Sequence, residues 1–116
     1  MIDSGQCDAY CQEKLYMIRQ ARLAQHVDKD KVQRIWLIND DIKPSQEVIS
    51  KYKGTRLVLA NGRDLLKEFP FEARPEDHIY VVDPMGNLMM RYPNKPDAQK
   101  IVGDLKRLIK LSHPEH

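Results

Sequence analysis

The sequence predicts a single α/β domain in which helices cover both faces of a sheet that ends in an antiparallel pair. Three observations predict it. Helix-like and strand-like segments alternate along the chain, as in folds that join parallel strands by crossover helices. The 116 residues fit one domain, and the 41% hydrophobic and 31% charged residues are typical of folded globular proteins. Without any repeat, linker or low-complexity tract, residues 1–116 form one domain.

The first half of the chain predicts two helices and two buried strands. Apolar residues at helical spacing predict a helix over about residues 8–26, and Pro44 and Ser45 open a second one that Gly54 can end. Segments 32–39 and 56–60 are largely apolar, which is typical of parallel strands covered on both faces. Residues 1–3 are too few for the strand expected before the first helix, so we expect that first strand to be truncated.

The second half predicts a hairpin between helices. Asn61 and Gly62 end the second buried strand, and expected elements follow over 63–69 (helix), 70–77 (loop), 79–83 (strand), 87–92 (strand) and 96–111 (helix). The turn that starts at Asp83 joins two strands with alternating polarity, which favours an antiparallel hairpin. The last helix directs Ile101, Leu105 and Leu108 inward.

Composition excludes several classes of function. Nineteen basic and seventeen acidic residues give a net charge of +2, and the two signs alternate along the chain, so we expect no nucleic-acid partner. The longest apolar runs have four residues, whereas a membrane-spanning helix needs about 20. No apolar stretch has the length of a signal peptide.

The two cysteines, Cys7 and Cys11, are the most informative residues. Their spacing near a helix start places the second sulfur one turn after the first, with Cα atoms about 6 Å apart, within the range of a disulfide. Such a pair can close a disulfide or bind a soft metal ion, and free N–H groups at the helix start favour a thiolate. Asp3 and Asp8 lie close by and oppose that charge, so we expect a thiol of moderate reactivity. The alternative is a pair of ordinary buried cysteines.

Two segments resemble one known family. The run C-D-A-Y-C-Q-E-K-L at 7–15, after Asp-Ser-Gly, resembles the C-x-x-x-C-x-x-x-L segment of Sco (SenC) proteins, and I-Y-V-V-D-P-M-G-N-L-M-M-R-Y-P at 79–93 resembles their final hairpin. The resemblance implies a thioredoxin-like fold and a role in assembling the copper site of cytochrome c oxidase. It also implies a periplasmic domain at the inner membrane, tethered by an N-terminal membrane helix absent from this chain. Cys7 and Cys11 would then be copper ligands or a dithiol/disulfide couple.

The resemblance also suggests a third copper ligand. Sco proteins place a histidine about nine residues before the proline of the hairpin turn, here Pro84, and the nearest histidine in this chain is His78, six residues before it. Asp77 occupies the neighbourhood where most thioredoxin-fold redox enzymes have a cis-proline. Weaker candidates for metal or acid–base chemistry are Met85, Met89, Met90, His113, His116, Glu72, Glu76 and Asp77.

The sequence therefore predicts a Sco-like metallochaperone or thiol reductant, with Cys7 as the more exposed attacking sulfur and Cys11 as the resolving one. Expected partners are a respiratory oxidase subunit or another thiol protein. Two other functions stay open: a thioredoxin-fold binding module that has lost the chemistry, and a general thiol-disulfide oxidoreductase.

Overall fold

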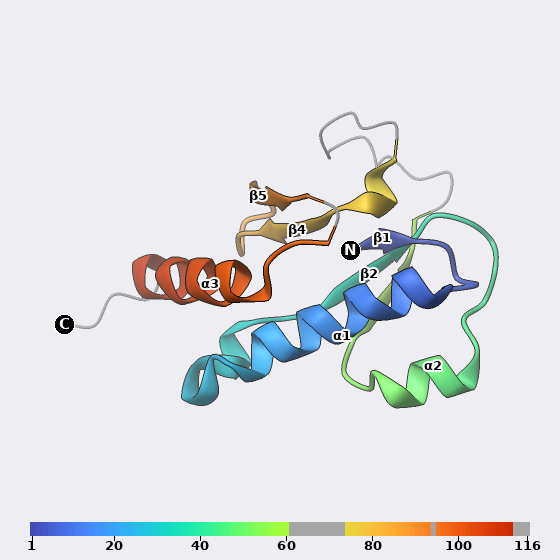
Figure 1. The fold of residues 1–116 in the computed structure, drawn as a ribbon, viewed down its shortest axis with the longest axis horizontal. Helices are drawn as coiled ribbons and strands as arrows, with labels where there is room; N and C mark the ends of the chain where they lie inside the picture. Colours follow the sequence, from blue (N-terminus) through green and yellow to red (C-terminus); the bar gives the residue numbers. More distant parts are fainter. Residues whose placement is uncertain (61–73, 94, 113–116) are drawn as a thin grey trace.

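The computed structural model describes residues 1–60, 74–93 and 95–112, and Figure 1 shows their arrangement. The described elements follow the predicted alternation of strands and helices. They are β1 (Ile2–Asp3), α1 (Ala9–Leu23), η1 (His26–Lys31), β2 (Ile35–Ile38), α2 (Gln46–Lys51), β3 (Arg56–Leu59), η3 (Pro75–Asp77), β4 (Ile79–Val82), β5 (Leu88–Tyr92) and α3 (Ala98–Ser112). The helix predicted over 63–69 lies outside the described residues.

Three parallel strands form the first sheet, in the order β1-β2-β3. Residues 2 and 3 pair with Leu37 and Ile38 of β2, which confirms that the start of the chain contributes strand structure before the first helix. β2 pairs with β3 along its whole length. Parallel strands need a crossover connection. α1 and α2 provide it, since each follows one strand and returns the chain to the end of the sheet at which the next strand begins.

The predicted hairpin is present as a second, antiparallel sheet. β4 pairs with β5, and the register is irregular between Val81 and Val82. The Asp83 carboxylate holds the turn, since it accepts hydrogen bonds from the backbone N–H groups of Met85 (2.9 Å) and Asn87 (2.8 Å). The described strands thus form two separate sheets, where the sequence predicted one mixed sheet.

Helix α1 contributes to two hydrophobic clusters. Its Cys11 and Leu15 pack with Trp36 and Ile38 of β2, together with Val48 and Tyr52 from the α2 segment. Further along, Ala21 packs on the hairpin and α3 in a second cluster that contains Ile79, Tyr92 and Ile101. α1 therefore joins the parallel sheet to the hairpin and α3, as Figure 1 shows.

The end of α1 differs from the expected one, whereas the start of α2 does not. α1 ends at Leu23 instead of about residue 26, and the 3-10 helix η1 follows it with His26 in the left-handed region (φ 54°). α2 begins where predicted, because Ser45 caps it by accepting the backbone N–H of Val48 (3.2 Å). α1 and α2 both contribute to the cluster around Trp36 and Ile38, whereas α3 packs with Ala21 of α1 against the hairpin.

Candidate functional site: a disulfide at the start of the first helix

Cys7 and Cys11 form a disulfide, with an S–S distance of 2.00 Å and Cα atoms 5.0 Å apart. The spacing of the two cysteines in the sequence allowed either a disulfide or a metal pair. The bond lies where the chain leaves β1 and enters α1, at the carboxyl end of the parallel strands (Figure 1). In open α/β sheets this edge is the usual place for functional residues.

Cys7 stands outside the helix, in a turn. Its backbone lies in the left-handed region (φ 44°), which non-glycine residues seldom adopt, and its N–H donates to the Ser4 carbonyl (3.1 Å). Asp8 is the N-cap of α1, and its carboxylate accepts the N–H of Cys11 (2.9 Å). From the sequence we expected free N–H groups at the helix start to stabilise a Cys7 thiolate. This expectation is weakened, because the Cys11 N–H at the helix start already donates to the Asp8 carboxylate.

Both sulfurs are more buried than the sequence suggested. Cys7 is 4% exposed and Cys11 is fully buried, and both belong to the cluster that contains Trp36 and Val48. The sequence predicted Cys7 as the more exposed of the two; the order is as predicted, but both residues are buried and Cys7 lies before the helix. Cys7 remains the more accessible of the two sulfur-bearing residues.

A set of hydrogen bonds to Asp40 holds the turn that precedes the disulfide. The Asp40 carboxylate accepts the Ser4 hydroxyl, the N–H of Gly5 (3.0 Å) and the N–H of Ile42 (3.1 Å). These bonds, the Ser4 one first, hold the pKa of Asp40 below its usual value. Gly5 has no room for a side chain, since a Cβ atom there would lie 1.7 Å from the Ile42 carbonyl oxygen. The 39–44 loop and the cysteine turn therefore pack backbone to backbone.

A buried ion pair lies one helical turn below Cys11. Lys14 is 3% exposed, and its ammonium group pairs with the Asp3 carboxylate (2.8 Å) while donating to the carbonyls of Ile2 (3.1 Å) and Glu76. Its three N–H bonds thus have three acceptors, from β1 and η3. Lys14 was not among the site residues predicted from the sequence. The available signal was a lysine three positions after Cys11, beside the apolar stripe of the helix.

Glu76 and Asp77, the described acidic residues before β4, form hydrogen bonds with other parts of the fold. The Asp77 carbonyl accepts the Tyr10 hydroxyl (3.0 Å), and the Glu76 carboxylate accepts the Asn39 side-chain amide (3.3 Å). Burial and the nearby Asp77 raise the pKa of Tyr10 above its usual value. This segment therefore fixes η3 against α1 and β2. Glu72 lies outside the described residues, and the described peptide bonds are all trans.

His78 is held by the hairpin. Its ring Nδ1 is 2.8 Å from the carbonyl oxygen of Tyr92, and its ring lies beside that of Tyr80. Within residues 1–60, 74–93 and 95–112, no three His, Cys, Asp or Glu side chains are grouped as a metal site. The predicted trio of Cys7, Cys11 and His78 is thus not assembled in this disulfide form.

The weaker candidates do not converge on the disulfide either. Met85 is 87% exposed at the hairpin turn, Met89 is half-exposed, and Met90 packs in the second hydrophobic cluster. The tail residues His113 and His116 lie outside the described residues.

A comparison with known protein families shows to which family this chain belongs. Residues 1–112 match the family described as "transmembrane-like, thioredoxin-like, C-terminal domain". The chain belongs to this family. The thioredoxin-like fold predicted from the sequence is therefore confirmed, and the disulfide lies within the matched domain. No curated protein matches the chain in sequence.

A solved structure supports the same fold. The SCO1/SenC family lipoprotein from Bacillus anthracis str. Ames superposes with a TM-score of 0.56 and 18% sequence identity, over 92% of this chain and 77% of that one. The resemblance to Sco/SenC proteins is thus confirmed at the level of the fold. None of the described helices is long and apolar enough to cross a lipid bilayer.

Proposed function

We propose that this protein is a Sco-like thiol-disulfide protein that acts through reversible opening of the Cys7–Cys11 bond. The observation that carries the proposal is the disulfide itself, which lies between a β-strand and the start of the following helix in a thioredoxin-like domain. The Asp40 hydrogen bonds hold the turn before Cys7, so that turn can keep its conformation while the sulfur bond opens.

As a reductant, the protein would act in two exchange steps. The Cys7 thiolate attacks a disulfide of the partner, so that a mixed disulfide forms and one partner thiolate leaves. The Cys11 thiolate then attacks the Cys7 sulfur, which closes the internal bond and releases the second partner thiolate. Two electrons pass from this chain to the partner. Cys7 is the attacking residue because Cys11 is fully buried.

Copper as cargo is the second candidate. In the reduced protein two soft thiolates would suit Cu(I), and His78 is the candidate third ligand. The likeness to a SCO1/SenC family lipoprotein favours this function. The same likeness supports an extracytoplasmic location at a membrane, the periplasmic side of the inner membrane in our proposal. The partner would be a respiratory oxidase subunit or another thiol protein.

Two measurements test these functions. The dithiol reduction potential is measured against glutathione buffers, and the reduced protein is titrated with Cu(I) and Cu(II). A reversible two-electron potential in the range of thiol oxidoreductases, about −120 to −270 mV, supports exchange. Tight one-to-one copper binding supports the cargo role. If the bond does not open reversibly and no copper binds, both functions are refuted and a binding module remains.

Variants separate the roles of the residues. In Cys11→Ser the mixed disulfide with a model partner should accumulate, because the resolving thiol is missing, whereas Cys7→Ser should form little of it. For copper, His78→Ala should weaken binding if His78 is a ligand. The matched control is His26→Asn. His26 is exposed and has a left-handed backbone, which asparagine adopts readily, so this variant should leave copper binding unchanged.

A further inference from the structure

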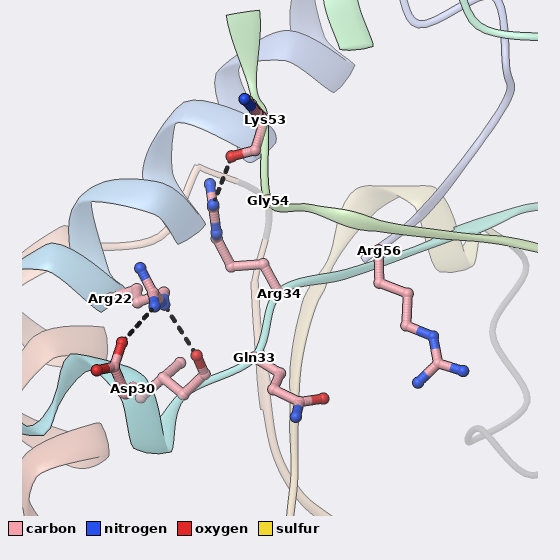
Figure 2. A pocket seen from close by; sticks show the side chains of 8 residues that line it. Arg22, Asp30, Gln33, Arg34, Lys53, Gly54 and Arg56 are labelled. Atoms are coloured by element: carbon pink, nitrogen blue, oxygen red, sulfur yellow. Dashed lines mark hydrogen bonds and ion pairs between the residues drawn. The ribbon is translucent and has the colours of Figure 1, made fainter. Parts of the chain in front are cut away.

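A cationic hollow of about 420 Å³ lies at the opposite end of α1 from the disulfide. Its lining comes from the last turn of α1, the chain that enters β2 and the chain that enters β3, and comprises Arg22, Asp30, Val32, Gln33, Arg34, Lys53, Gly54 and Arg56. Asp30 is the one carboxylate in this lining, beside four cationic side chains. Figure 2 shows the arrangement. Arg22 is eleven positions after Cys11, about 16 Å along the helix.

Arg34 is the unusual residue of this hollow. It is only 8% exposed, and its Nη2 donates to the Lys53 carbonyl (2.9 Å). Its Nε and Nη1 atoms are buried and have no hydrogen-bond partner in the part of the chain that the structure describes. Among the described residues, three N–H bonds of a charged group therefore have no acceptor, and an N–H bond left without one is costly inside a protein.

The neighbours of Arg34 add positive charge without supplying that acceptor. Arg22 donates from Nε to the Val32 carbonyl (2.9 Å) and from Nη2 to Asp30 (3.1 Å), as the dashed lines in Figure 2 show. Burial, and then Arg22 and Arg19, lower the pKa of Arg34. The Asp30 carboxylate is largely exposed and engages Arg22.

The backbone around the hollow is shaped to admit the guanidinium. Gly54 has a left-handed backbone (φ 96°), and a Cβ atom there would lie 2.5 Å from Arg34 Nη2. Figure 2 shows Arg34 extending toward Lys53 past Gly54, while the Arg56 side chain extends away from it. Arg56 pairs in register with Ile35, next to Arg34 in sequence, and neighbouring strand residues face opposite sides of a sheet.

We propose that this hollow binds a phosphate group, with Arg34 and Arg22 as the recognising residues. Phosphate oxygens are the acceptors that a buried guanidinium lacks, and a dianion matches a lining with several cations and one carboxylate. The exposed side chains of Gln33 and Lys53 form part of the lining, and the proposal requires side chains of this lining to move so that phosphate oxygens reach the buried Nε and Nη1. The group can belong to inorganic phosphate or to a small phosphomonoester. This site is independent of the disulfide chemistry.

The test is an NMR titration of the ¹⁵N-labelled full chain. Inorganic phosphate, glycerol 3-phosphate and acetate are added separately at ionic strength held constant with chloride, and the amide signals of Arg34 and Gly54 are followed. We expect saturable shifts with phosphate. Tighter binding of glycerol 3-phosphate would identify an ester as the natural source, and equal or weaker binding would identify the free ion. Shifts that do not saturate, or acetate binding as tight as phosphate, would overturn the proposal.

Variants assign the binding to the buried guanidinium. Arg34→Gln should weaken phosphate binding at least about tenfold, because it removes charge-assisted hydrogen bonds. Lys106→Gln is the control, since it removes one positive charge from an exposed residue of α3 outside this lining, and binding should stay within about twofold. Should Arg34→Gln fail to fold, Arg22→Gln at the same hollow takes its place with the same expected loss. Equal loss in the control and the test variant would show nonspecific surface charge and refute the site.

Discussion

Replacing Lys14 by methionine should destabilise the protein far more than a lysine substitution normally does. The variant removes an ammonium group that is 3% exposed and leaves the Asp3 carboxylate, 11% exposed, without its 2.8 Å partner. The carbonyls of Ile2 and Glu76 lose a donor as well. Removing one member of a buried ion pair costs about 3 to 5 kcal/mol, so we expect a loss of that size. For a domain of this length the loss lowers the Tm by roughly 12 to 20 °C.

Urea unfolding of the oxidised protein, followed by circular dichroism, measures this loss directly. Lys106→Met is the matched control because Lys106 is an exposed residue in the middle of α3, and it should change the free energy of unfolding by less than about 0.5 kcal/mol. The double variant Asp3→Asn, Lys14→Met should recover part of the stability, since no unpaired charge stays buried. If Lys14→Met loses no more than Lys106→Met, the inference of a buried, fully bonded ammonium is wrong.

Two further predictions concern the turn before the disulfide. Gly5→Ala should lower the free energy of unfolding by about 1 to 3 kcal/mol, because its Cβ atom would lie 1.7 Å from the Ile42 carbonyl oxygen. The control is Gly103→Ala, which lies in open space on α3 and should raise the free energy of unfolding by up to about 1 kcal/mol. Both are measured by urea unfolding, and equal effects would contradict the packing. Asp40 has a folded-state pKa below its usual value of about 4, so its contribution to stability is present above that pH and is lost as the pH falls through the folded pKa. The Tm advantage of the native protein over Asp40→Asn should therefore shrink between pH 5 and pH 2.5, and an advantage that stays constant would refute this role of Asp40.

Local patterns were sufficient to predict most of the elements. The parallel strands and the hairpin lie where apolar runs and the Asp83 turn placed them, within one to three residues. The expected cover on both faces is not found for β3, where Leu57 and Leu59 are exposed. The cysteine spacing predicted a pair close enough to bond, and the bond is present. These features depend on residues that are near in sequence, so a single sequence contains the information.

The supporting contacts of the site could not be predicted in the same way. Lys14 meets Glu76 across 62 positions, and Gly5 meets Asp40 across 35. Nothing near Gly5 in the sequence indicates that its missing side chain makes room for a distant carbonyl. The burial of Cys7 also depends on a left-handed turn that no motif specified.

Arg34 illustrates a different limit. In the sequence it is one of many basic residues and directly precedes an apolar strand, so it looks like ordinary surface. Only the folded chain shows that α1 and the entry to β3 enclose its guanidinium.

The short span of the Cys7–Cys11 link has a thermodynamic consequence. The link closes a ring of only five residues, and in the chain-entropy description so small a ring restricts the unfolded chain by about 2 kcal/mol at 25 °C. Much of the architecture is instead supported by α1, which is shared by both hydrophobic clusters. In the redox cycle that we propose, we therefore expect the scaffold to persist when the bond opens.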